Sequence, residues 1–223
     1  MTANPQENLP SSAPAGPEMP ETRRSDAPSP MLVIISGPSG VGKDTIIEAL
    51  QRRGHLPAYH YVVTCTTRAP RGNEIDGVSY NFVTVPEFLA LRDAGELLEA
   101  NEVHGNWYGT PRAGVRDALA RRQHAILKID VQGAEAVKRE VPGALLIFVL
   151  PPSREELIAR LRGRNSEDTA SFEARLQTAD AELARVDEYD YAVVNDTVEA
   201  CVRKLRAIRL AEHCRRGRLE FPR

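Results

Sequence analysis

The chain has 223 residues, 42% hydrophobic and 27% charged, so it can bury one sizeable core and still keep a solvated surface. Its formal net charge of −2 lacks the basic excess of nucleic-acid-binding proteins, and no apolar run approaches the roughly 18 residues of a membrane span. The three cysteines (Cys65, Cys201 and Cys214) are not spaced as a CxxC pair and no signal-peptide core is present, which favours a cytoplasmic protein without a disulfide framework or zinc site.

The first 30 residues differ from the rest of the chain. They contain seven prolines and almost no large apolar side chain. Such a segment cannot bury enough surface to offset its ordering entropy, so we expect residues 1–30 to be a disordered tail. Met31 stands directly before the first predicted strand, which favours a dispensable tail or a later start codon over a functional segment.

Strands alternate with helices over residues 31–215, which we predict to form one domain. The predicted strands are 32–35, 125–130, 145–150 and 191–194, and the predicted helices are 45–53, 131–140, 153–162 and a last one from about residue 198. Short, wholly apolar strands are typical of a sheet that is covered on both faces. The pattern predicts an α/β domain with a mainly parallel core sheet.

The stretch between the first two of these units has a different pattern. Short β-like runs at 61–66, 80–83 and 98–103 are separated by glycine and proline, which predicts an inserted β-rich lobe over residues 64–110. Further on, residues 162–175 are polar and predict a mobile loop.

A phosphate-binding loop follows the first strand. Gly37-Pro38-Ser39-Gly40-Val41-Gly42-Lys43 matches the pattern GxxxxGK between a strand and a helix. Glycines let backbone N–H groups surround phosphate oxygens, and the lysine reaches the β- and γ-phosphates. This loop, extended by Asp44 and Thr45, is the predicted ATP site.

Asp44 departs from the usual loop, which carries Ser or Thr there to bind Mg²⁺. Two interpretations stay open. The carboxylate approaches Mg²⁺ directly or through water, or it points into solvent and favours the helix N-terminus electrostatically. We expect the second.

A second phosphate site is predicted in the inserted lobe. Arg68 and Arg71 lie three apart beside small hydroxyl residues, and a guanidinium suits the bidentate grip of a phosphate. Hydroxyls of Tyr80 and Tyr108 complete such a site. Glu99 is an acceptor-only group that matches the N1–H and N2–H₂ edge of guanine, whereas adenine has no such pair of donors.

With these motifs the chain resembles the guanylate kinase family from about residue 32 to 208. The resemblance rests on the P-loop, the Thr66-Thr67-Arg68-Ala69-Pro70-Arg71 run, the 80–83 strand, the 105–110 turn and Ile129-Asp130-Val131-Gln132-Gly133-Ala134. It implies a P-loop three-layer fold with a GMP-binding lobe and a helical lid over residues 160–178. It implies transfer of the γ-phosphoryl group of ATP to GMP, and to dGMP as well, with Mg²⁺.

The resemblance also implies residue roles. Arg68, Arg71, Tyr80 and Tyr108 hold the GMP phosphate, while Glu99, Thr64 and Thr110 read the guanine. Asp130 lies near the acceptor and is, with Asp44, the candidate for the metal. Lys43 and the lid residues Arg164 and Arg175 are the predicted catalytic groups, and Asn195 is an adenine contact.

Lys128 stands where the family often has an acidic residue, and we expect a structural or solvent-facing replacement there. Two alternatives to the guanylate kinase interpretation are a kinase for ribose 1,5-bisphosphate and a non-catalytic guanylate-kinase-like binding module. The sequence leaves monomer or homo-oligomer open.

Overall fold

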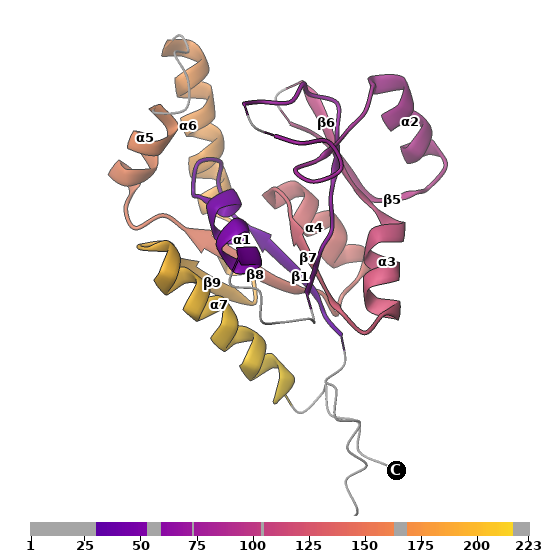
Figure 1. Ribbon diagram of the computed structural model, residues 1–223. Coiled ribbons are helices and arrows are strands. Elements are labelled where there is room, and N and C mark those ends of the chain that lie inside the picture. Colours follow the sequence, from indigo (N-terminus) through magenta and orange to yellow (C-terminus); the bar gives the residue numbers. More distant parts are fainter. Residues whose placement is uncertain (1–29, 53–58, 73, 104, 163–168, 216–223) are drawn as a thin grey trace, which may run out of the picture.

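The computed structural model describes residues 30–52, 59–72, 74–103, 105–162 and 169–215. Its centre is a five-stranded parallel sheet with the strand order β2-β7-β1-β8-β9 (Figure 1). The strands are β1 (Leu32–Ser36), β2 (Tyr59–Tyr61), β7 (His124–Lys128), β8 (Leu145–Leu150) and β9 (Tyr191–Val194). The predicted α/β class with a mainly parallel sheet is confirmed.

Because all five strands run in one direction, their carboxyl ends meet at a single edge. Strand β1 lies between β7 and β8, and Ile35 on β1 stands opposite Lys128, the last residue of β7. The P-loop leaves β1 at this edge, so the residues that follow β7 lie beside it. Ligand sites of open α/β sheets occur at such an edge.

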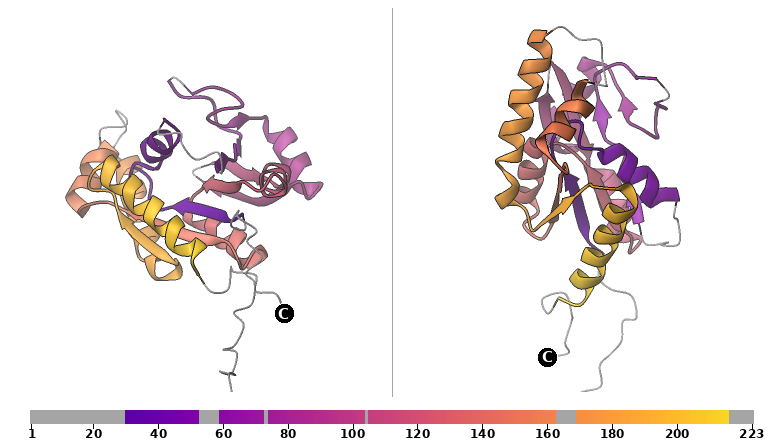
Figure 2. Two further views of the ribbon diagram at one scale, coloured as in Figure 1. Left: turned by 60° about the horizontal axis from the view of Figure 1, so that its bottom comes forward. Right: turned by 90° about the vertical axis from the view of Figure 1, so that its left-hand side faces the viewer.

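Helices cover both faces of the sheet and make three layers (Figures 1 and 2). Side chains alternate along β1: Val33 and Ile35 pack under α1 (Lys43–Arg52) and α7 (Val198–His213). Leu32 and Ile34 pack under α3 (Arg112–Ala120) and α4 (Val131–Glu140). This two-sided burial explains why the strands have no polar face.

The inserted lobe has its own four-stranded sheet in the order β4-β3-β6-β5. Its elements are β3 (Cys65–Thr66), β4 (Asn81–Phe82), α2 (Val85–Asp93), β5 (Leu97–Val103) and β6 (Asn106–Pro111). The run predicted at 61–66 is split, because Tyr61 ends β2 and pairs with β7 in the core sheet. Helix α2 was not predicted; a capping box between Thr84 and Glu87 begins it.

The described residues of the predicted lid, 160–178, belong to two helices, α5 (Arg154–Arg162) and α6 (Thr169–Leu183). Leu157 and Leu161 of α5 pack against Ala179 of α6. The loop predicted at 162–175 is therefore helical from Thr169 onward, and residues 163–168 lie outside the described residues. A 3₁₀ turn, η1 (Val186–Glu188), links α6 to β9. Of the predicted tail, residues 1–29 likewise lie outside the description.

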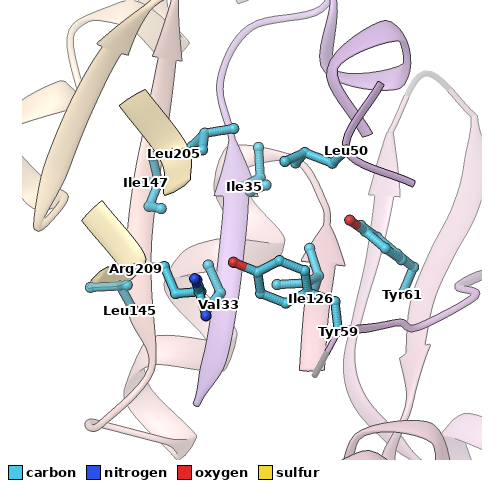
Figure 3. Close-up of a pocket in the computed structure, with 10 residues that line it drawn as sticks. All are labelled: Val33, Ile35, Leu50, Tyr59, Tyr61, Ile126, Leu145, Ile147, Leu205 and Arg209. Atoms are coloured by element: carbon cyan, nitrogen blue, oxygen red, sulfur yellow. The ribbon is translucent and has the colours of Figure 1, made fainter. Parts of the chain in front are cut away.

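A small apolar cavity of about 20 Å³ lies between the sheet and α7 (Figure 3). Side chains from β1, β2, β7, β8, α1 and α7 line it, with Arg209 and the two tyrosines of β2 as the polar groups. The volume suffices for about one water molecule and excludes a nucleotide. Within the ranges described, no helix is long and apolar enough to cross a membrane.

Candidate functional site

The P-loop turns tightly at the carboxyl end of β1. Gly37 has φ of 139°, and a Cβ atom there would meet the carbonyl oxygen of Val149 at 2.4 Å. Gly42 has φ of 99°, and a Cβ atom would meet the side-chain nitrogen of Asn195 at 2.7 Å. Both positions need glycine, because they combine a left-handed backbone with a close neighbour.

Two side chains from outside the P-loop donate hydrogen bonds to the carbonyl of Val41, in the middle of the loop. Asn195 donates its side-chain nitrogen to this oxygen at 2.8 Å, and Arg160 of α5 donates to it at 3.2 Å. Asn195, predicted as an adenine contact, is buried beneath the loop and does not line the cavity described below. In the structure the side chain of Asn195 thus supports the loop backbone through this hydrogen bond.

Lys43 lies folded against its own loop. Its Nζ donates to the carbonyls of Gly37 at 2.5 Å and Pro38 at 3.1 Å. Burial lowers the pKa of Lys43, while the carboxylates of Glu182, Asp44 and Asp130 oppose that shift. Burial outweighs these three carboxylates, so the net direction of the pKa shift of Lys43 is downward.

Glu182 of α6 also reaches the P-loop. Its Oε2 accepts from the backbone N–H of Ser39 at 3.3 Å. Burial raises the pKa of Glu182, and the nearby Lys43 ammonium lowers it. Sequence reasoning missed this residue, since nothing in a single helix pattern indicates a contact across 143 positions.

The P-loop and the inserted lobe face one another across a cavity of about 610 Å³. This volume is in the range of ligand sites for small molecules. Of the predicted site residues, those that line it are Ser39, Gly40, Val41, Gly42, Lys43, Asp44, Thr64, Arg68, Arg71, Tyr80, Glu99, Tyr108, Asp130 and Arg175. Those that do not are Gly37, Pro38, Thr45, Thr110 and Asn195. Arg164 lies outside the described residues.

Arg68 is the most enclosed cation of the acceptor lobe. Its guanidinium donates to both carboxylate oxygens of Glu74 at 2.6 Å and lies 4.9 Å from the centre of the Tyr80 ring. Tyr80 in turn meets Tyr108 edge-on, with ring centres 6.2 Å apart. Glu74, which sequence reasoning missed, therefore fixes the direction of the Arg68 fork. Arg71 is more exposed and lines the same wall.

Glu99 lies at the floor of the lobe and is buried, with 6% of its surface exposed. Its Oε1 accepts from the Thr110 hydroxyl and its Oε2 from the Asn101 amide, each at 2.7 Å. Burial raises the pKa of Glu99 to about 7. The hydrogen bonds from Thr110 and Asn101 oppose this shift, whereas the nearby charge of Asp130 adds to it.

The neighbours of Glu99 follow from the strand geometry. Thr110 is its partner on the adjacent strand β6, and Asn101 lies two residues on, on the same face of β5. Helix α4 closes the other side, because a Cβ atom on Gly133 would come within 3.1 Å of Glu99 Oε2. Side chains two residues apart on a strand point to the same face, and this spacing from Glu99 could have identified Asn101 as its neighbour.

Asp44 lies in the first turn of α1 with 55% of its side chain exposed, as the solvent-facing interpretation expects, and it also has a partner that the sequence did not indicate. Lys128 donates its Nζ to Oδ1 of Asp44 at 2.5 Å. Of the two roles expected for Lys128, the structural one agrees with this pair better than the solvent-facing one: 21% of its side chain is exposed, and its Nζ lies 4.8 Å from the Tyr80 ring centre. The strand register explains this, because it sets the end of β7 beside the P-loop.

Asp130 begins α4 at the same edge. Its Oδ1 accepts from the N–H of Gly133 at 2.9 Å and caps the helix. Its carboxylate also lines the cavity. Among the described residues, no three His, Cys, Asp or Glu side chains gather as a metal site.

The chain was compared with known proteins. A profile of the family described as guanylate kinase matches residues 29–212. A guanylate kinase of Clostridium acetobutylicum is 44% identical over 190 residues, which cover 85% of this chain and 90% of that protein. A guanylate kinase of Nocardia farcinica is 46% identical over 176 residues, which cover 78% of this chain and 90% of that protein.

The fold agrees with the sequence matches. The crystal structure of guanylate kinase from Anaplasma phagocytophilum superimposes with a TM-score of 0.70 at 32% identity, covering 85% of this chain and 89% of that one. The profile spans most of the domain, and the relatives match over nearly their whole length. The chain therefore belongs to the guanylate kinase family.

Proposed function

We propose that the chain transfers the γ-phosphoryl group of ATP to GMP, in agreement with its membership of the guanylate kinase family, and also to dGMP. One observation carries this proposal: a single cavity is lined by the P-loop, by the Arg68–Tyr80–Tyr108 cluster and by Glu99. A P-loop alone supports only binding of a nucleoside triphosphate. A second phosphate site opposite it supports transfer between two nucleotides.

The nucleophile in this proposal is an oxygen of the GMP phosphate, so no general base is needed. Lys43 positions the β- and γ-phosphates, and Arg68 with Arg71 holds the acceptor phosphate in line. Arg175 from α6 lines the same cavity and neutralises charge on the transferring group, together with Arg164. Catalysis is then positioning and charge neutralisation.

Mg²⁺ is the implied cofactor. When bound with ATP, it would supply positive charge against the negative charge of the transferring group. Asp130 is the residue that would hold it through water, since its carboxylate lines the cavity. Asp44 fits this role less well, because Lys128 occupies one of its oxygens.

Guanine selection in this proposal depends on Glu99. Its ionised carboxylate accepts from N1–H and N2–H₂ of guanine, while Thr110 and Asn101 hold it in place. Thr64 lines the cavity and supplies a further hydroxyl. Adenine offers no matching pair of donors on that edge, so the buried carboxylate would not gain both hydrogen bonds.

The test is an acceptor panel. Purified protein with Mg²⁺ and ATP is offered GMP, dGMP, AMP or ribose 1,5-bisphosphate, and ADP release is followed. ADP release with GMP and dGMP only is expected, and Lys43→Met should abolish it. Turnover with AMP would refute the role of Glu99, turnover with the bisphosphate would favour the alternative kinase, and no turnover would favour a binding module.

A further inference from the structure

The contact between Asp44 and Lys128 joins two positions that are 84 residues apart. Asp44 follows the P-loop lysine in the first turn of α1 and is 55% exposed at its side chain. Lys128 ends β7, deep at the sheet edge. Both line the large cavity between the P-loop and the inserted lobe.

A carboxylate at position 44 creates an electrostatic problem. P-loops usually carry a hydroxyl at this position, which is neutral and contacts Mg²⁺. Asp44 instead adds a negative charge beside the site for a triphosphate, and like charges at short distance in a partly enclosed site repel. Lys43 also lies near this carboxylate, but its ammonium donates to the loop carbonyls of Gly37 and Pro38.

Lys128 is placed to offset that charge. The pairing of Ile35 with Lys128 sets its backbone next to the strand that feeds the P-loop. On its other side the ammonium lies 4.8 Å from the ring centre of Tyr80, the phenol of the acceptor phosphate site. The lysine thus stands between the two phosphate sites, held by a carboxylate on one side and an aromatic ring on the other.

We propose that Asp44 and Lys128 act as one unit in binding the phosphate donor, in which the Lys128 ammonium cancels the Asp44 carboxylate beside the triphosphate. Lys128 is then a positioning residue that works through Asp44. The inference rests on the proposed function only for the identity of the donor as ATP.

The test is a cycle of four proteins: wild type, Lys128→Met, Asp44→Asn and the double variant. Equilibrium binding of ATP without acceptor is measured for each. Lys128→Met should raise the Kd for ATP at least fivefold, because it leaves the carboxylate uncompensated. Asp44→Asn alone should lower the Kd, and the double variant should return to within twofold of wild type.

Control variants distinguish a role of the Asp44–Lys128 pair in ATP binding from a purely structural role. Lys138→Met removes a comparable pair with Asp190 away from the cavity, where the two groups are 3.3 Å apart, and should leave the Kd for ATP unchanged. Lys128→Arg keeps the charge and should bind ATP within twofold of wild type. If Lys128→Met lowers the thermal midpoint of the free protein, Lys128→Gln replaces it in the cycle.

Two results would overturn the proposal. One is a rise of less than fivefold in the Kd of the lysine variant, and the other is a rise that Asp44→Asn fails to reverse. Turnover of GMP is assayed in the same wild-type preparation. Absent turnover would reject the proposed function, whereas the ATP binding cycle would still decide whether the pair acts as one unit.

Discussion

Single residues in this site take their properties from the groups packed around them. Glu99 is a carboxylate whose pKa is raised to about 7, first by burial, against an ordinary value of 4.5. The folded protein therefore binds this proton more tightly than the unfolded chain does. The contribution of Glu99 to stability falls as pH rises from about 4.5 to about 7.

The same shift predicts a pH dependence of catalysis. Below pH 7 the free enzyme carries a protonated Glu99, which cannot accept from both guanine donors, so kcat/KM for GMP should fall about tenfold per pH unit. The second ionisation of the GMP phosphate, near pH 6, adds its own effect. A pH profile of kcat/KM for wild type and Glu99→Gln separates the two ionisations, because the profile of the variant should depend on the GMP phosphate alone. An identical profile for both proteins would contradict the prediction.

Arg68 gives a second prediction at this scale. Lysine at this position keeps the charge but cannot bind both oxygens of Glu74 or lie flat on Tyr80. Arg68→Lys should raise the KM for GMP about tenfold, roughly 1.4 kcal/mol, with the KM for ATP unchanged. Arg92→Lys is the matched control, since Arg92 also lies over an aromatic ring of the lobe, Trp107, away from the cavity. Equal effects of both variants in steady-state assays would count against the Arg68 site.

At the scale of elements, α4 lies beside two of the predicted site residues. Its first residue is capped by Asp130, and Gly133 in its first turn lies against Glu99. Alanine is the better helix former by roughly 1 kcal/mol, so the glycine is retained at a cost in helix propensity. The absence of a side chain there gives Glu99 its room.

Gly133→Ala should therefore produce opposite changes in two measurements. The helix gains propensity, yet a Cβ atom 3.1 Å from Glu99 Oε2 displaces the carboxylate, so the KM for GMP should rise several-fold. Gly143→Ala is the control, because a Cβ atom there meets nothing within 4 Å. Thermal unfolding and GMP kinetics are measured for both variants. An unchanged KM in the Gly133 variant would show that Glu99 tolerates the added atom.

Elements also show what the sequence predicts well. The runs at 145–150 and 191–194 and the helix at 131–140 were predicted with their observed bounds, because apolar runs and periodicity are local signals. Helix α2 was missed although Thr84 and Glu87 form a capping box that is visible in the sequence. The partners of Lys128 and Glu182 were missed because they are distant in sequence and depend on strand register and helix packing.

At the scale of the whole molecule, the core sheet and the inserted lobe contribute separate walls to one cavity. ATP at 100 times its Kd should stabilise the fold by about 2.7 kcal/mol, a rise of roughly 5–10 °C in Tm for a domain of this size. GMP should add its own increment. In thermal unfolding with each ligand, Arg71→Ala should keep the rise in Tm that ATP causes and lose most of the rise that GMP causes. Loss of the ATP increment as well would mean that the two sites are not separate.

The register that sets Lys128 opposite Ile35 also matters for exchange of parts between relatives. Residues 37–45 are contiguous and look like a cassette, but the counterpart of Asp44 lies on the neighbouring strand. A chimera that receives a loop with serine at position 44 would keep an ammonium without its carboxylate. That chimera should bind ATP more tightly, as is expected for Asp44→Asn, so loop and strand end have to be exchanged together where the charge balance of the pair is to be kept.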